Sequence, residues 1–349
     1  MINRVSVHKE QEEVPMTKKE KFLSVMRNEK PIKWMGYGFD AWPQCQFHCV
    51  IDPITIWDIL FISGEHVLDH WGVVHRFLPG DPGIIPMVNE ENQVIKDITH
   101  WRDYVEFPEI PTDLDWSGTK AQIDAIDREN EFVMIPTFRG LFERAHCLMT
   151  FEDTLVNMYE EPEAMYDLFS AYADWKIKVA EMLCDNVDFD VIHSHDDWGS
   201  KTATFFSVAK FRELLKPHYQ RLYDYYHKRG KIVQHHCDCY AAEFAPELVD
   251  LGVEMWQGVL PSNNIPEVQK ATQGKILLMG GLDQGLIDQE DVSEEQVRAE
   301  VRRAIDEYAP GGAFLPCVGS LECLNAWVTP VVIDECNRYG AEWLAKQNK

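Results

Sequence analysis

A short stretch after residue 231 concentrates side chains that bind metals or move protons. The apolar pair at residues 232–233 is closely followed by five such side chains: His235, His236, Cys237, Asp238 and Cys239. A buried parallel strand has this pattern when its last residues leave the core and open into an active site. A further thiol, Cys317, follows another short apolar run at 313–316. We predict that these two strand ends face one cavity.

Three of these side chains form a candidate metal site. His235 and Cys237 stand two residues apart, and alternate residues of a strand point to the same side. With Cys317 they would supply one imidazole and two thiolates, a set that suits Zn²⁺ and leaves one coordination position for substrate. The pattern H-x-C alone is a weak signal, because many cysteines are simply small buried hydrophobes.

Other ligands could replace members of this trio. Cys239 has the same strand parity as Cys237, whereas His236 faces the opposite side. Cys323 lies close to Cys317 in the sequence. A carboxylate is a further possibility.

A second polar stretch, residues 195–199, follows the apolar run at 190–192. Its adjacent carboxylates Asp196 and Asp197 could orient His195 or accept a proton, with one pKa raised by the other charge. We predict that these three residues are catalytic. The alternative is a helix-capping loop with Trp198 packed over it.

Further candidates for substrate binding stand at the predicted strand ends: Asp40, Trp42, Arg139, Trp198, Gln257 and Asp283. Arg139 could hold an anionic substrate group, but it could equally pair with a carboxylate, which we favour. A pocket lined by Trp42, Trp198 and Trp256 would favour a methoxylated aromatic molecule, and a small polar pocket would favour a thiol. An isolated aspartate after a strand is more often a helix cap.

Short apolar strands alternate with longer amphipathic helices, which predicts a parallel α/β sheet. Seven strands are predicted, near 34–39, 132–136, 190–193, 232–233, 254–258, 276–280 and 313–316. The irregular excursion at 70–117, read as a hairpin lid, leaves room for an eighth strand. A closed (β/α)8 barrel is therefore the preferred fold, with an open doubly wound sheet as its rival. No G-x-G-x-x-G or Walker sequence follows a strand, which weakens the nucleotide-binding rival.

Helix signals divide the chain into a loose arm, residues 1–16, and one barrel domain, residues 17–349. Thr17 with Glu20, and Ser293 with Gln296, fit the capping box that begins a helix. Long helices are predicted at about 162–184 and 329–345.

Composition excludes several classes of function. The formal net charge of −25 makes a nucleic-acid backbone an unsuitable partner. No run of about 18 apolar residues exists to span a membrane. The first fifteen residues lack the apolar core of a signal peptide, so we expect a cytoplasmic protein. Nine cysteines in such a chain are expected to be thiols available for metal or redox work.

Several short segments together resemble the uroporphyrinogen decarboxylase superfamily. They occur in matching order from about residue 17 onward: 17–22, 142–145, 196–199, His235-x-Cys237, 280–283 and 309–312. The resemblance implies a (β/α)8 barrel. The decarboxylases of this superfamily carry an N-terminal R-Q-A-G-R type segment, and this chain has none; Asp40 resembles their pyrrole-binding aspartate.

The chain is more similar to the cobamide-dependent methyltransferase branch, including methyltransferase components of O-demethylase systems. That resemblance implies zinc held by His235, Cys237 and Cys317, although Cys317 follows Pro316 instead of the usual glycine. It also implies methyl transfer between a small molecule and a corrinoid. The chain has no D-x-H-x-x-G cobalamin-binding sequence, so a separate corrinoid protein is expected. The alternatives are a methylcorrinoid:thiol methyltransferase, a metal-free decarboxylase and a non-catalytic binding barrel.

Overall fold

The computed structural model describes residues 16–26, 47–59, 62–78, 84–318 and 324–347. The predicted strand at 34–39 and the candidates Asp40, Trp42 and Cys323 therefore lie outside the described residues. So do residues 1–15, nearly all of the predicted arm.

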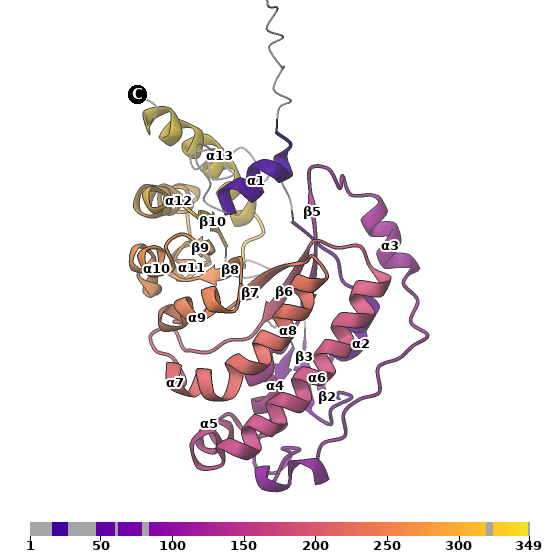
Figure 1. Ribbon diagram of the computed structural model, residues 1–349. Coiled ribbons are helices and arrows are strands. Elements are labelled where there is room, and N and C mark those ends of the chain that lie inside the picture. Colours follow the sequence, from indigo (N-terminus) through magenta and orange to yellow (C-terminus); the bar gives the residue numbers. More distant parts are fainter. Residues whose placement is uncertain (1–15, 27–46, 60–61, 79–83, 319–323, 348–349) are drawn as a thin grey trace, which may run out of the picture.

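A curled sheet of seven parallel strands forms the centre of the fold (Figure 1). Its spatial order is β1 (Phe47–Cys49), β5 (Phe132–Thr137), β6 (Val191–His195), β7 (Ile232–His236), β8 (Met255–Val259), β9 (Leu277–Gly281) and β10 (Phe314–Cys317). From β5 to β10, each strand of this sheet is hydrogen-bonded to the sheet strand that follows it along the chain, as in a half-barrel. Most of their residues are buried, which explains why the strands read as short apolar runs.

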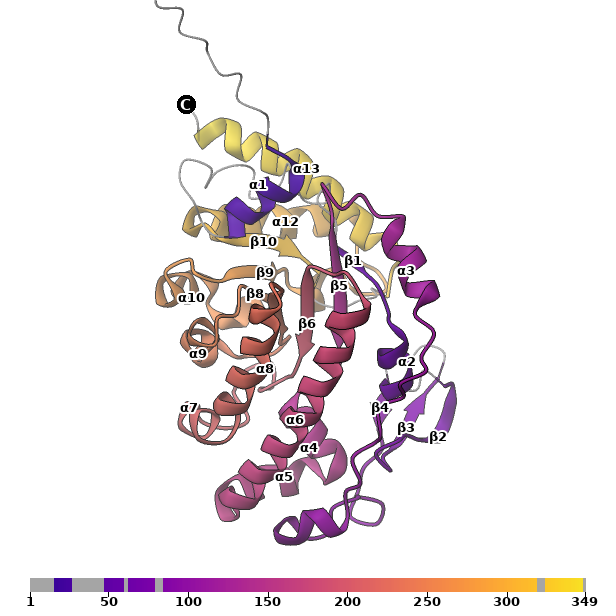
Figure 2. The ribbon, with the colours of Figure 1, turned by 45° about the vertical axis from the view of Figure 1, so that its right-hand side comes forward.

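Helices surround this sheet, and Figure 2 shows them stacked along its convex side. Those that follow or precede its strands are α4 (Leu141–Leu148), α5 (Phe151–Glu160), α6 (Pro162–Asn186), α7 (Val208–Lys210), α8 (Lys216–Lys228), α9 (Ala245–Asp250), α10 (Ile265–Thr272), α11 (Gln284–Ile287), α12 (Glu294–Tyr308) and α13 (Val328–Gln347). Earlier in the chain come α1 (Lys18–Met26), α2 (Pro53–Ile59) and α3 (Ser117–Asp124). The α/β architecture predicted from the sequence is thus confirmed.

Local capping chemistry sets several helix starts. The Thr17 hydroxyl accepts from the Glu20 amide at 3.1 Å, and the Glu20 carboxylate accepts from the Thr17 amide at 2.8 Å. Ser293 and Gln296 form the same reciprocal pair before α12. Both capping boxes were predicted, because their chemistry spans only four residues.

The described residues of the excursion at 70–117 contribute no strand to the parallel sheet. Instead β2 (Gly64–Leu68), β3 (Val74–Phe77) and β4 (Ile85–Pro86) form a separate antiparallel sheet. The hairpin character was therefore predicted, but the possible eighth parallel strand from this region was wrong. Antiparallel neighbours need only short turns, which suits a segment without crossover helices. Within the described ranges the parallel sheet has seven strands, so the predicted eight-stranded closure is not shown.

The core lies between the curled sheet and its helices and continues under the β2–β4 sheet. Fully buried aromatic side chains fill it, among them Trp198, Trp256, Tyr219 and Tyr223. Among the described residues, no helix is both long enough and apolar enough to cross a bilayer.

Candidate functional site

The carboxyl ends of β6 and β7 bring three histidine rings together. His195 and His236 are register partners on these parallel strands, and their ring centroids lie 4.4 Å apart. His193 lies on the same side, 5.3 Å from His236. His235 faces the other way, where its Nδ1 and the Tyr223 hydroxyl of α8 are 2.9 Å apart. The face of β7 that is turned away from α8 therefore presents His236, not His235.

His195 pairs with Glu143, which lies in the first turn of α4. The His195 Nδ1 is 3.0 Å from a Glu143 carboxylate oxygen. Burial alone lowers the pKa of His195, but the charge and hydrogen bond of Glu143 outweigh it and raise that pKa to about 9. Burial likewise raises the pKa of Glu143, but the His195 charge and hydrogen bond lower it to about 2. The pair is thus an imidazolium beside a carboxylate at neutral pH.

Asp196 is completely buried and ties α4 to the strand ends. Its carboxylate accepts from the backbone amides of Phe142 at 3.1 Å and Glu143 at 2.9 Å, two amides of the first turn of α4. It also accepts from the Trp198 Nε1 at 2.8 Å and the Tyr219 hydroxyl at 2.5 Å. Burial and the Glu143 charge nevertheless raise the pKa of Asp196 to about 6. Asp196 therefore acts as the helix cap that was the alternative interpretation of the sequence.

Gly140 permits this close approach of α4. A Cβ at this position would lie 2.3 Å from the Asp196 side chain and 2.5 Å from the Tyr219 hydroxyl. Any larger residue would push α4 away from the strand ends, together with Glu143.

Asp197 and Asp238 lie beside the histidines. Asp197 is half-buried and Asp238 is exposed, and the Asp238 amide donates to the Asp197 Oδ1 at 3.0 Å. Burial and the Glu143 charge raise the pKa of Asp197 to about 7. Partial desolvation of its carboxylate also raises the pKa of Asp238, against the His195 charge. Within the described ranges neither carboxylate forms an ion pair with a lysine or arginine.

Asp197 belongs to three groups of potential metal ligands whose atoms lie within 4.8 Å of one another. The groups combine Asp197 with Cys237 and Cys239, with Glu143 and His195, or with His236 and Asp238. Across the described part of the chain, His235 and Cys317 join no such group. The predicted trio of His235, Cys237 and Cys317 is therefore not brought together as one cluster.

Cys237 and Cys239 form a buried thiol pair. Their Sγ atoms are 3.1 Å apart, and both residues are nearly inaccessible. Burial, followed by the neighbouring Cys239 thiol, raises the pKa of Cys237 well above its ordinary value. The Cys237 carbonyl accepts from the Trp256 Nε1 at 2.9 Å, which fixes this turn against the core.

Gln257 stands between His236 and the end of β10. Its Oε1 bonds the Nδ1 of His236, and its Nε2 approaches the Val318 carbonyl at 3.5 Å. A hydrogen bond from Gln257 also reaches the Cys317 thiol, whose pKa burial raises to about 12. Gln257 and Cys317 thus lie on the same side of the sheet as His236.

The other predicted substrate-binding residues have different surroundings. The Arg139 guanidinium pairs with Asp69 at 3.1 Å and contacts both ring nitrogens of His75, the carboxylate pairing favoured from the sequence. Trp198 is fully buried, with its ring 4.2 Å from that of His235, so a substrate could reach it only if the loop moved. Asp283 is exposed at the start of α11. Substrate binding by Arg139, Trp198, Gln257 and Asp283 stays a prediction.

Sequence reasoning missed Glu143 and His193 as site residues. Glu143 occupies the third position of a helix directly after strand β5, and its capping contact to the Gly140 amide was a detectable signal. His193 shares the parity of His195, two residues away, but the sequence pattern places it inside the predicted strand at 190–193 and not at its end. Its pKa is lowered to about 4 by burial, and it bonds Gln234 at 2.6 Å.

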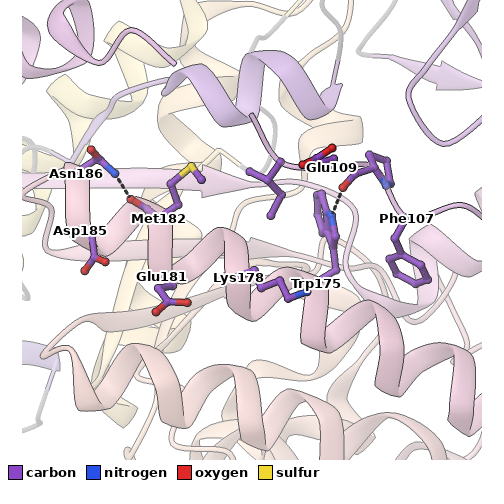
Figure 3. A pocket seen from close by; sticks show the side chains of 10 residues that line it. Phe107, Glu109, Trp175, Lys178, Glu181, Met182, Asp185 and Asn186 are labelled. Atoms are coloured by element: carbon purple, nitrogen blue, oxygen red, sulfur yellow. Dashed lines mark hydrogen bonds between the residues drawn. The ribbon is translucent and has the colours of Figure 1, made fainter. Parts of the chain in front are cut away.

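A surface hollow of about 620 Å³ lies elsewhere. Figure 3 shows it between α6 and residues 107–110, where the Trp175 Nε1 donates to the Pro108 carbonyl at 2.9 Å. Its lining includes no residue from the strand ends. It is therefore not part of the candidate site.

Comparisons with known proteins agree with this architecture. A methyltransferase from Methanosarcina mazei has a similar solved structure, with a TM-score of 0.60 and 12% sequence identity over 95% of this chain and 100% of that one. At this identity the likeness concerns the fold. A comparison with curated protein sequences found no match.

The family comparison covers more than half of the chain. The model for uroporphyrinogen decarboxylase (URO-D) matches residues 79–319, a span from the β3–β4 region to the end of β10. The resemblance predicted from short segments is thereby confirmed. The chain belongs to the uroporphyrinogen decarboxylase (URO-D) family.

Proposed function

We propose that this protein is a zinc-dependent methyltransferase that moves a methyl group between a methylated small molecule and a separate corrinoid protein. The URO-D family membership and the likeness to a methyltransferase structure support this proposal. The observation that carries it is the position of Asp197. This carboxylate adjoins both the ion pair of protonated His195 with Glu143 and two sets of metal-ligand side chains, at the sheet edge where α/β enzymes of this type react.

The donor chemistry around Asp197 fits a divalent metal. Cys237, Cys239 and Asp197 offer two sulfurs and one oxygen, whereas His236, Asp238 and Asp197 offer one nitrogen and two oxygens. Either set has three ligands and leaves a position for substrate. When bound, Zn²⁺ supplies Lewis-acid stabilisation of the leaving atom or, in the opposite direction, a lowered pKa for a thiol substrate. The set with His235 and Cys317 stays a prediction that requires rearrangement of these side chains.

His195 is proposed as the general acid. Glu143 keeps its imidazole protonated and fixes the ring through Nδ1, so that Nε2 can deliver a proton to a leaving oxygen. Asp197 would orient the bound substrate or its metal. Asp196 is proposed as a positioning residue, because its four hydrogen bonds hold the first turn of α4, and therefore Glu143, against β6.

The proposed function includes two candidate small molecules, a methoxylated aromatic methyl donor and a thiol methyl acceptor, which correspond to opposite directions of transfer. A methoxylated aromatic donor was predicted from Trp42, Trp198 and Trp256, but Trp198 and Trp256 are fully buried. They therefore give no present support to an aromatic-lined pocket. A thiol acceptor remains the alternative substrate.

Methyl-transfer assays test the function directly. The purified protein, with measured metal content, is mixed with cob(I)alamin and a panel of methoxylated aromatics and simple methyl donors. Formation of methylcobalamin with at least one donor is expected. Absence of transfer in both directions, with methylcobalamin and thiols as the reverse pair, would contradict the proposal.

Family membership also favours one second candidate, decarboxylation of an organic acid without a metal. It predicts CO₂ release that is unchanged after chelation. Stoichiometric metal together with methyl transfer would exclude it.

A further inference from the structure

We infer that the cation of the proposed enzyme binds His236, Asp238 and Asp197, a nitrogen–oxygen site, and not the cysteine thiolates. The catalytic role of this cation rests on the proposed function, whereas the choice of its ligands rests on the geometry of the site. Ligand atoms of these three residues lie within 4.8 Å of one another. Two residues come from the end of β7 and the third from the end of β6.

Strand parity favours His236 over His235. The ring of His236 lies beside His195 and His193, on the face of β7 that is turned away from α8. The ring of His235 lies against Trp198 and Tyr223, inside the layer between sheet and helices. A metal on His235 would therefore sit in the layer between sheet and helices, against Trp198 and Tyr223. A metal on His236 would sit beside the Glu143–His195 pair.

The surroundings of His236 are those of an oriented ligand. Gln257 bonds its Nδ1, which leaves Nε2 as the nitrogen for a cation. Metal-bound histidines commonly have the other ring nitrogen fixed in this way. Gly258 follows Gln257 at a bulge in β8, with φ +92°. A Cβ there would lie 3.2 Å from the His236 ring and 3.0 Å from the Asp238 Cβ, so the missing side chain leaves room for both ligands.

Access and charge distinguish the two candidate sets. Cys237 and Cys239 have exposures of 0% and 4%, whereas Asp238 is exposed and Asp197 half-buried. A cation with an open position must be reachable by a substrate. Asp197 and Asp238 also lack any lysine or arginine ion pair within the described ranges, so a divalent cation would balance both charges. Carboxylate and imidazole ligands without sulfur would accept Mn²⁺ or Co²⁺ as well as Zn²⁺.

Cobalt substitution provides a readout that is independent of methyl transfer. The full-length protein is stripped with a chelator, titrated with Co²⁺ and followed by absorption spectroscopy and calorimetry. Cobalt thiolates show a strong ligand-to-metal charge-transfer band in the near ultraviolet. We expect stoichiometric Co²⁺ binding without this band.

Matched variants separate the two ligand sets. His236→Gln and Asp238→Asn are expected to weaken Co²⁺ binding by at least about tenfold, since even residues that only support a ligand change affinity by 10–100-fold. His235→Gln, the same change one residue away on the other face, should alter it by less than about twofold. Cys237→Ser combined with Cys239→Ser should also retain the metal. Thermal unfolding of each variant confirms that it is folded.

The opposite pattern would overturn the inference. A charge-transfer band that disappears in the double cysteine variant, or affinity lost in His235→Gln but kept in His236→Gln, would place the metal on sulfur or in the core. Failure to bind Co²⁺ at all would also overturn it. Metal binding as expected without methyl transfer would instead contradict the proposed function and leave the metal site standing.

Discussion

Glu143 and Arg144 are neighbours in the first turn of α4, yet they enter two different clusters of charge. Arg144 points to Asp58 at 3.3 Å and Asp69 at 3.5 Å, and Arg139 also pairs with Asp69. Glu143 points to His195 at 3.0 Å, next to the carboxylate of Asp197. We call the first the arginine cluster and the second the histidine cluster.

The two clusters differ in how completely their charges are matched. In the arginine cluster the guanidinium groups meet carboxylates directly, and the Trp71 ring lies 4.4 Å from the Arg144 guanidinium carbon. Such a buried, matched network fixes the β2–β4 sheet to the parallel sheet. In the histidine cluster the charge of His195 lowers the pKa of Asp197 and Asp238, and among the described residues neither carboxylate forms an ion pair with a lysine or arginine. Carboxylates with raised pKa values and no matching cation are common at functional sites, where a ligand can supply the missing charge.

The largest expected effect concerns activity. Glu143→Gln keeps the shape and the capping contact to Gly140 but removes the charge that holds His195 protonated. Methyl transfer should fall by roughly 10²–10⁴-fold, the usual contribution of a general acid. Steady-state kinetics with cob(I)alamin measure it. A change below threefold would show that the histidine cluster is structural too.

The next effect concerns stability. Arg144→Met leaves the buried carboxylates of Asp58 and Asp69 with fewer partners. We expect a loss of about 3–5 kcal/mol in the free energy of unfolding, as for other broken buried ion pairs. Urea denaturation of both proteins gives this value. If stability were unchanged, the arginine cluster would not fasten the β2–β4 sheet.

Acid should weaken the arginine cluster in a defined window. Burial raises the pKa of Asp69, but the His75 hydrogen bond and the charges of Arg144 and Arg139 outweigh it and lower that pKa from 3.8 to about 2. The ionised form is therefore favoured by folding, and its contribution is complete above pH 4 and lost as the pH falls towards 2. It corresponds to roughly 2 kcal/mol. Unfolding curves from pH 6 to pH 2 should show the stability gap between wild type and Asp69→Asn closing over this window. A gap independent of pH would contradict the assignment.

The smallest effect is expected for a matched pair at the surface. Arg102 pairs with Asp167 on the outside of the molecule, where both side chains are largely exposed. Arg102→Met should change the free energy of unfolding by less than about 1 kcal/mol. Comparison with Arg144→Met in the same urea titration isolates burial as the cause of the difference. Equal losses would show that pairing alone, without burial, sets the stability.

Much of the fold was predictable because its signals are local. Six of the seven predicted strands are present close to their expected positions, and both capping boxes form as expected. The role of residues 64–86 was not predictable in full. Their separate antiparallel sheet depends on contacts with Arg139 and Arg144, which lie more than fifty residues later in the chain.

Some features of the candidate site were likewise predictable from the sequence, and others depend on the tertiary structure. The sequence by itself determined that His235 and His236 end one strand and must point to opposite faces, because side chains of a strand alternate. The sequence also determined that two thiols and a carboxylate come directly after these histidines in the chain. Only the tertiary structure decided which histidine meets His195, because that choice depends on which face of β7 the helix α8 covers. Tyr223 and Trp198 pack on the side of β7 that carries His235. His236 is therefore the histidine that faces His195 and the candidate site.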